Sequence, residues 1–178
     1  MLHWNGTKWS TQAVPSPAGS ATGAFNAINR LSCTSASSCW AVGTYGTKGL
    51  SDTTFLNQAL RWNGHKWSKV TTPNPDGTAS GDNNVFNGVT CSAANNCWAV
   101  GTRGDSVEIG EALHWTGTKW SLVKTPNPGG TANGDQTDLN DVRCVSQKDC
   151  WAVGFSRKNS DPDRKLTLHW NSVKWSAS

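Results

Sequence analysis

The stretch that decides the fold is CTSASSCWAVGT at residues 33–44, which returns as CSAANNCWAVGT at residues 91–102 and as CVSQKDCWAVGF at residues 144–155. A second motif, HWNGTKWS at residues 3–10, has counterparts at residues 61–68, 114–121 and 169–176. Self-similarity at 50-odd residues is typical of a protein built from repeated supersecondary units. The chain is therefore predicted to be a repeat protein.

Each period is predicted to contain four short strands and no helix, because short apolar runs alternate with turn signals. Strand A ends at the first cysteine, strand B begins at the second, and strands C and D flank the WNGTKW turn. The connection between strands B and C carries all the length variation, which is typical of a surface loop. A repeated four-stranded antiparallel meander of this kind indicates an all-β protein, a β-propeller.

We expect about three and a half blades in one propeller domain. Residues 1–22 are predicted to form a partial blade, a C–D hairpin with a linker, and residues 23–77, 78–130 and 131–178 to form three complete blades. Closed propellers have about four to eight blades, so one chain should leave an open edge that a second copy could cover. A dimer that completes a six-bladed ring is the favoured arrangement.

The six cysteines form three identical C-x5-C pairs: Cys33 with Cys39, Cys91 with Cys97, and Cys144 with Cys150. Each pair is expected to lie across the A–B hairpin and to form a structural disulfide. Free buried thiols, or metal or redox chemistry, are the alternatives, although zinc sites favour closer cysteines with further ligands nearby. Because disulfides persist in oxidising compartments, the parent protein is predicted to be extracellular.

Composition excludes several classes of protein. The chain has 178 residues, a net charge of +4 and eleven tryptophans, which indicates a globular domain rather than a disordered one. Lys and Arg are scattered, so we expect no nucleic-acid partner, and no apolar run approaches the ~20 residues of a membrane span. The repeat begins right after Met1 without a signal peptide. We therefore expect a domain excised from a longer exported chain, or an engineered one.

Catalytic and metal-binding patterns are weak. Glu108 and Glu111 are the only glutamates and share one variable loop, whereas a glycosidase needs two carboxylates facing each other across a cleft. The loops PDGTASGDNN and GDQTDLND carry oxygen ligands that calcium favours, but without EF-hand spacing. His3, His114 and His169 occupy one repeat position and are expected to face solvent on different blades. We predict no catalytic residue, no metal site and no cofactor.

The tryptophans are more informative. Trp40, Trp98 and Trp151 follow the second cysteine of each pair and are predicted to form the core between blades. An exposed indole beside Asn and Lys can stack on a sugar ring while amides bind the hydroxyls. The candidate ligand-binding residues are the pairs that flank the C–D turns: Trp4, Trp9, Trp62, Trp67, Trp115, Trp120, Trp170 and Trp175.

The order of strand A, CWAVG, strand C and WNGTKW resembles the secreted repeat β-propellers of bacteria, of the BNR or Asp-box-like type. In that family a GWAVG-type strand is followed by a hairpin of the form T-x-D-G-G-x-x-W. Here Asn5, Asn63 and Asn171 stand in place of the Asp, and Thr116 does so in the fourth copy. The resemblance implies a propeller in which these hairpins are structural. The Asn-Gly sequences predict tight turns with positive φ at both residues.

We therefore expect a non-enzymatic extracytoplasmic binding or scaffold module that forms homo-oligomers through its blade edges. The alternative is a multivalent lectin-like propeller that binds carbohydrate, with avidity from repeated weak sites. The expected partners are a second copy and a glycan or protein ligand, with neither nucleic acid nor membrane. The B–C connections YGTKGLSDTTF, RGDSVEIG and SRKNSDPDRK are predicted to share one rim with the D–A connections.

Overall fold

The computed structural model describes residues 1–46 and 54–178, and its regular structure consists of strands. A two-stranded hairpin, here called the N-terminal hairpin, is followed by three four-stranded sheets, blades 1 to 3. The hairpin contains β1 (Leu2–Trp4) and β2 (Trp9–Thr11). Blade 1 contains β3 (Phe25–Ser35), β4 (Ser38–Gly46), β5 (Leu56–Trp62) and β6 (Trp67–Val70). Blade 2 contains β7 (Asn84–Ala93), β8 (Asn96–Arg103), β9 (Ile109–Trp115) and β10 (Trp120–Val123). Blade 3 contains β11 (Gln136–Ser146), β12 (Asp149–Arg157), β13 (Arg164–Trp170) and β14 (Trp175–Ala177).

Each blade is an antiparallel meander whose four strands pair in chain order. This confirms the predicted all-β class and the predicted A, B, C and D strands of three complete units. The N-terminal hairpin corresponds to strands C and D, and among the described residues it pairs with no further strand. The predicted B–C connection of blade 1 falls largely on residues 47–53, which lie outside the described residues.

The three cysteine pairs staple the A–B hairpins. In each blade the two cysteines are directly opposite each other in the strand register. All three pairs form disulfides, with Cα atoms 4.0 Å apart. The predicted disulfides are thereby confirmed, and they are typical of an oxidising, extracytoplasmic environment.

The glycine that ends each WAVG segment is required by the close approach of the neighbouring strand. A Cβ atom at Gly101 would lie 1.8 Å from the carbonyl oxygen of Val85 on β7. The corresponding distances at Gly43 and Gly154 would be 2.0 and 1.9 Å. Any larger residue would therefore push strand A away from strand B.

A β-bulge in each A strand lies beside this contact and carries an asparagine. In blade 2, Asn87 donates from Nδ2 to Asp138 Oδ1 at 2.9 Å and to the carbonyl oxygen of Leu139 at 3.2 Å. In blade 1, Asn29 donates in the same way to the carbonyl oxygen of Phe86 at 2.7 Å. The bulge asparagines therefore tie the A strands of blades 1 and 2 to the A strand of the following blade.

The hydrophobic core lies between neighbouring blades. Trp40 and Leu113 belong to the cluster between blades 1 and 2, and Trp98 and Leu168 belong to the cluster between blades 2 and 3. Both tryptophans are at most 1% exposed, as predicted. The prediction for Trp151 is wrong, because its side chain is 41% exposed. Among the described residues, no further sheet packs on the face of blade 3 that carries Trp151.

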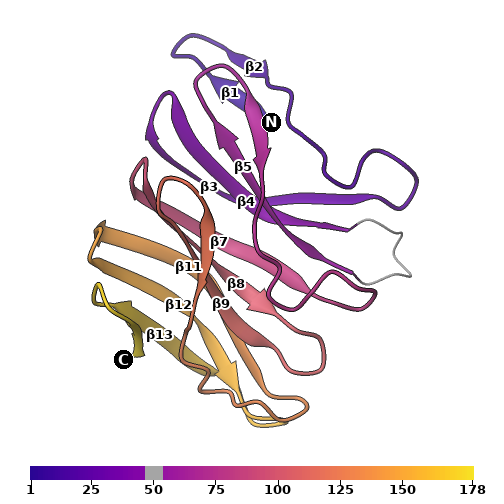
Figure 1. Cartoon of the computed structure of the whole chain (residues 1–178), viewed down its shortest axis with the longest axis vertical. Helices are drawn as coiled ribbons and strands as arrows, with labels where there is room; N and C mark the ends of the chain where they lie inside the picture. Colours follow the sequence, from indigo (N-terminus) through magenta and orange to yellow (C-terminus); the bar gives the residue numbers. More distant parts are fainter. Residues whose placement is uncertain (47–53) are drawn as a thin grey trace.

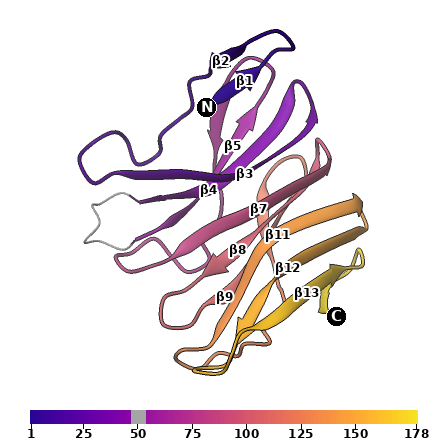
Figure 2. The same cartoon turned by 180° about the vertical axis from the view of Figure 1, so that it is seen from behind.

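The blades form an open row. Figures 1 and 2 show the three sheets one after another along the long axis, with the N-terminal hairpin at one end and blade 3 at the other. Ile28 and Leu31 on β3 are exposed, although Phe86 and Val89 at the same register positions of β7 are buried. The predicted open edge is present at both ends.

The loops between strands B and C meet the loops between consecutive blades at one rim. The backbone amide of Gly104 donates to the carbonyl oxygen of Asn83 at 2.9 Å, and that of Gly134 donates to Ser106 at 2.8 Å. The predicted shared rim is therefore confirmed for blade 2.

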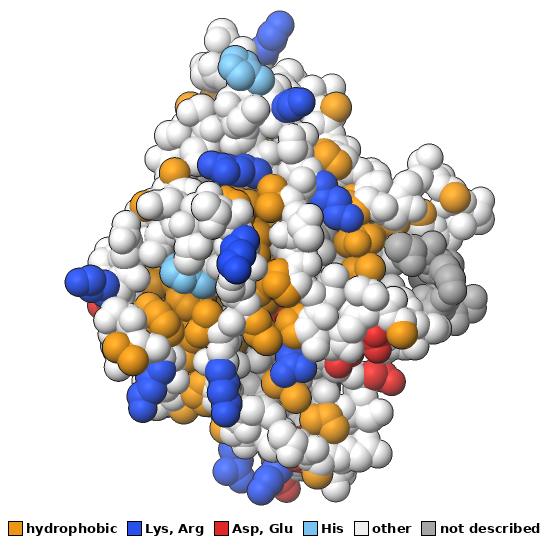
Figure 3. All heavy atoms as spheres, in the orientation of Figure 1, with side chains coloured by type: hydrophobic (Ala, Val, Ile, Leu, Met, Phe, Trp, Pro, Cys, Tyr) orange, Lys and Arg blue, Asp and Glu red, His pale blue; other side chains and the backbone are white. Residues whose placement is uncertain are grey.

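The surface shows no concentration of positive charge on the face drawn in Figure 3, where Lys and Arg side chains are spread as separate groups among apolar and uncharged ones. Within residues 1–46 and 54–178, no helix has the length and apolar character needed to span a membrane.

Candidate functional site

The C–D turns fix the positions of the paired tryptophans. Trp4 and Trp9 are opposite each other in the register, so the turn between them has four residues. Asn5 Oδ1 accepts hydrogen bonds from the backbone amides of Thr7 at 3.0 Å and Lys8 at 2.9 Å, and the glycine after Asn5 has a φ of +96°. The prediction of positive φ at both residues is therefore wrong. The asparagine instead organises the turn through its side chain, as Asx turns do.

Each turn brings two indole rings into contact. The ring centroids are 5.7 Å apart in the pairs Trp4/Trp9 and Trp62/Trp67, and 5.9 Å apart in the pairs Trp115/Trp120 and Trp170/Trp175. The four pairs are also tilted similarly, by 41° to 49°. The repeat therefore builds the same aromatic surface at all four hairpins.

Where a complete blade precedes it, such a pair receives a third tryptophan. Trp40 of blade 1 lies 4.8 and 5.0 Å from Trp115 and Trp120 of blade 2. Trp98 of blade 2 lies 4.7 and 5.1 Å from the pair of blade 3. The B-strand tryptophan of one blade thus fills the space beside the paired tryptophans of the next.

Two histidines of the second motif stack on the tryptophans of the B strands. His114 is stacked on Trp98 with centroids 4.3 Å apart and planes at 10°, and its burial lowers its pKa. His169 is stacked on Trp151 at 4.3 Å. The prediction that these histidines face solvent is wrong for His114, which is half-buried, because strand C places it over the indole of strand B.

A pocket of about 470 Å³ lies between the N-terminal hairpin and blade 1. Its aromatic lining consists of His3, Trp4, Trp9, Trp62 and Trp67. This is the space that a B-strand tryptophan fills between complete blades, and among the described residues no B strand pairs with the N-terminal hairpin to supply one. The pocket therefore follows directly from the half blade.

The rest of the pocket offers polar and small groups. Gln12 lines it from the hairpin, and Thr34 and Ser35 line it from the end of β3. The Trp62 indole is fixed by a hydrogen bond from its Nε1 to the carbonyl oxygen of Ala36 at 3.0 Å. The pocket thus combines a held aromatic wall with amide and hydroxyl groups at its margin.

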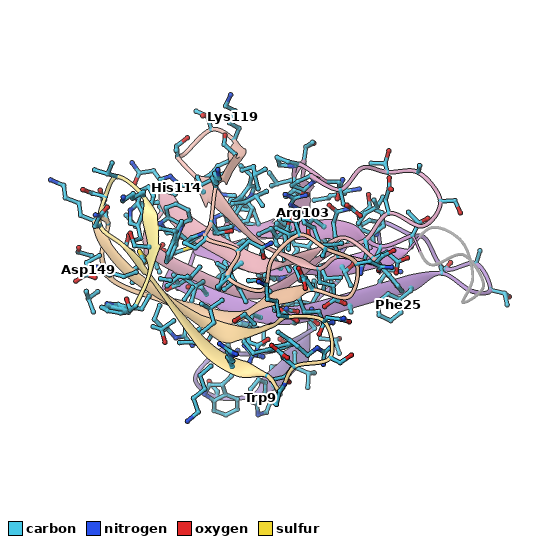
Figure 4. The ribbon with its side chains drawn as sticks, turned by 90° about the horizontal axis from the view of Figure 1, so that it is seen from below. Trp9, Phe25, Arg103, His114, Lys119 and Asp149 are labelled. Carbon is cyan, nitrogen blue, oxygen red and sulfur yellow. A yellow bond between two sulfur atoms is a disulfide. The ribbon has the colours of Figure 1, made fainter. Side chains whose placement is uncertain are left out.

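The eight candidate tryptophans differ sharply in exposure. Trp4 and Trp9 are 48% and 64% exposed, and Figure 4 shows Trp9 at the periphery of the molecule. Trp62 and Trp170 are partly buried. The remaining four, Trp67, Trp115, Trp120 and Trp175, are buried. The structure therefore brings two exposed and two more enclosed tryptophans together at the N-terminal end, and encloses most of the others between blades.

The acidic loops are organised by their own turns. Asp82 Oδ2 accepts from the backbone amide of Ala79 at 2.6 Å, and Asp135 Oδ2 accepts from Ala132 at 2.8 Å. In the part of the chain that the structure describes, no three His, Cys, Asp or Glu side chains are grouped as metal ligands.

Glu111 is fully buried between blades 1 and 2, where burial raises its pKa from 4.5 to about 8.

Sequence reasoning did not identify Gln12, Thr34 and Ser35 as pocket residues. Their neighbourhood depends on how the half blade packs on blade 1, and no spacing in the sequence records it. The only available signal was the missing A and B strands of residues 1–22, which imply an unfilled space beside the next blade.

No protein-family model matches the chain, and no curated protein matches it. Among solved structures it is similar to the GH74 xyloglucanase from Xanthomonas campestris, with a TM-score of 0.50 and 10% identity over 94% of this chain and 24% of the enzyme. The chain thus spans about a quarter of that enzyme's length. It is also similar to a fucose lectin from Kordia zhangzhouensis in complex with methyl-fucoside, with a TM-score of 0.49 and 11% identity over 84% of this chain and 97% of the lectin. Together with the three stapled meanders, the likeness to the xyloglucanase identifies the fold of the chain as a row of β-propeller blades.

Proposed function

We propose that the chain is a non-enzymatic, extracytoplasmic carbohydrate-binding module of the secreted Asp-box-like type, and that its binding site is the pocket beside the N-terminal hairpin. One observation carries the proposal. Trp62 and Trp67 form the same surface that elsewhere holds an indole ring, yet here that surface borders an open pocket of about 470 Å³.

A sugar ring fits the chemistry of this pocket. Ligand pockets commonly measure about 300–1,000 Å³ and combine apolar walls with a few placed polar groups. The apolar face of a pyranose can stack on an indole, and Trp62 is held in place by its bond to Ala36. Gln12, Thr34 and Ser35 supply donors and acceptors for hydroxyl groups at the margin.

The non-enzymatic part of the proposal is supported by the lining of the pocket, which includes no Asp or Glu among the described residues. Glycoside hydrolysis requires two carboxyl groups on either side of the scissile bond. Glu111 is enclosed between blades, and Glu108 Oε2 accepts a hydrogen bond from Gln136 Nε2 at 2.5 Å. Neither glutamate is among the residues that line the pocket.

A second candidate function is that of an assembling scaffold. The exposed apolar residues Trp151 and Val153 on blade 3, at one end of the row, favour it.

The test is a glycan array on the oxidised protein, followed by calorimetric titration with the sugar that binds. We expect one site per chain and a change in tryptophan fluorescence on binding. Trp62→Ala removes the stacking wall, which should weaken binding about tenfold, the value of one aromatic contact. Val145→Ala is the control, because it removes an exposed apolar side chain that does not line the pocket.

A blank array would overturn the proposal. So would equal affinity in the wild-type and Trp62→Ala proteins. Because Trp62 also packs against blade 1, His3→Ala provides a second variant that alters the exposed side of the pocket, and it should weaken the same sugar.

A further inference from the structure

The two contacts between complete blades follow one rule. The B-strand tryptophan of a blade inserts against the paired tryptophans of the next, at centroid distances of 4.7 to 5.1 Å. The contact has a direction, from blade 1 to blade 2 and from blade 2 to blade 3. The contacts between complete blades therefore indicate what the uncovered surfaces at the two ends of the row could bind.

Blade 3 presents the inserting half of this contact without a receiver. Trp151 is 41% exposed, although Trp98 at the same position of blade 2 is fully buried. The Trp151 ring is nevertheless held, because His169 is stacked on it at 4.3 Å and His169 Nε2 lies 2.9 Å from Asp149 Oδ1. The exposed indole is thus already ordered in the position that Trp98 takes when it inserts.

The N-terminal hairpin presents the receiving half without an inserted ring. The centroids of Trp4 and Trp9 are 5.7 Å apart at 48°, and those of the filled pair Trp115/Trp120 are 5.9 Å apart at 49°. The free pair is half exposed, whereas Trp115 is 3% exposed. The hairpin therefore has the geometry of a filled receiver, but no tryptophan of the same chain inserts into it.

We propose that blade 3 of one chain packs against the N-terminal hairpin of a second copy, with Trp151 inserted between Trp4 and Trp9. The N-terminal hairpin and blade 3 lie at opposite ends of the row in Figures 1 and 2, so one chain cannot bring them together without bending. The contact continues the interface that the chain already makes twice within itself. Its occupant is a second copy because the receiving pair belongs to the same repeat.

This contact is head-to-tail. A heterologous contact of this kind closes into a ring if its rotation allows and otherwise extends into an open row. It uses Trp151, which does not line the pocket, together with Trp4 and Trp9, which do. Trp151→Ala therefore tests assembly without changing the pocket lining, whereas Trp9→Ala changes both. The inference is independent of the proposed carbohydrate function and survives its failure.

The test is sedimentation velocity of the oxidised protein from micromolar to millimolar concentration. We expect reversible self-association of the wild type. Trp151→Ala and Trp9→Ala should each weaken it about 30-fold or more, as expected for a tryptophan anchor at an interface. Trp9 is 64% exposed and Trp151 is 41% exposed, so neither change should unfold a chain. Val145→Ala is the matched control, because Val145 is an exposed apolar residue of the same blade, 79% exposed.

A mixture of the two variants tests the direction of the contact. Trp151→Ala retains the receiving pair and Trp9→Ala retains the inserting ring, so the mixture should form a one-to-one complex and no larger species. A wild type that stays monomeric throughout would overturn the proposal. So would undiminished assembly of Trp151→Ala, or failure of the mixed variants to pair.

Discussion

Glu111 offers the sharpest test of how the blades pack. Its carboxyl group is fully buried between blades 1 and 2, and burial raises its pKa from 4.5 to about 8. The Asn57 amide and the Arg103 cation lower the pKa to a smaller extent. Neither carboxyl oxygen has a partner in hydrogen-bonding geometry among the described residues. The folded state therefore favours the protonated, neutral form.

The consequence is a loss of stability as pH rises. Between pH 4.5 and about 8 the folded chain retains a proton that the unfolded chain has released, so the free energy of unfolding falls with rising pH. At about 1.4 kcal/mol per pH unit, the full loss is on the order of 5 kcal/mol. Above the folded pKa the loss is complete and the curve flattens.

Glu111→Gln removes this titration. Gln58 occupies the same repeat position in blade 1 and is 2% exposed, so a buried amide is already accommodated there. Urea unfolding of the oxidised protein at about pH 5 and about pH 9 should show similar stability at the acidic pH and a more stable variant at the alkaline pH. The measured quantity is the difference between the two proteins, in which other titrating groups cancel.

Parallel pH profiles for wild type and variant would refute the reasoning, because they would mean that Glu111 is solvated or paired in the folded state. Gln58→Glu is the matched reverse change. It places a carboxyl group in the corresponding buried position and should steepen the loss of stability with pH.

Two further predictions concern the repeat architecture. Replacing both Cys91 and Cys97 by Ser should lower the free energy of unfolding, measured by urea unfolding, by about 2 kcal/mol, because the unfolded chain regains the entropy lost on closing this short loop. An unchanged urea midpoint would contradict a stabilising role of the disulfide. Asn87→Ala removes the hydrogen bonds to Asp138 and Leu139 of the next blade and should cost about 1–2 kcal/mol. Asn140 lies at the same bulge of blade 3, on which no further sheet packs among the described residues, so Asn140→Ala should cost less than about 0.5 kcal/mol. Equal costs for the two variants would refute the link between blades.

The position of the C–D turn could be predicted from the local sequence, but its backbone conformation could not. The Trp-Asn-Gly sequence and its two variants, Trp-Thr-Gly and Trp-Asn-Ser, correctly located the four hairpins, because Asn, Gly and Ser favour turns through their own chemistry. The turn conformation was wrong, since the cross-strand pairing of Trp4 with Trp9 leaves four residues in the loop and Asn5 accepts two backbone hydrogen bonds instead of taking a positive φ. The register between the two strands, which the sequence only suggests, determines the conformation of the turn.

The histidines of the second motif show that strand pairing also determines which side chains are exposed. His114 was expected in solvent because it lies on an outer strand. Strand pairing sets it opposite Trp98, and the two rings stack. The candidate pocket was likewise hidden, because its polar groups come from the hairpin and from β3 and meet only after the half blade packs on blade 1.

The sequence by itself determined the strands, the stapled hairpins and the count of three and a half blades, because each depends on short-range spacing and on chemistry between residues close in the chain. Only the tertiary structure decided which tryptophans are buried. Trp98 and Trp151 stand in the same CWAV segment, yet one is enclosed and the other is 41% exposed. The physical reason is that burial depends on the neighbouring blade, and among the described residues no further sheet packs on blade 3.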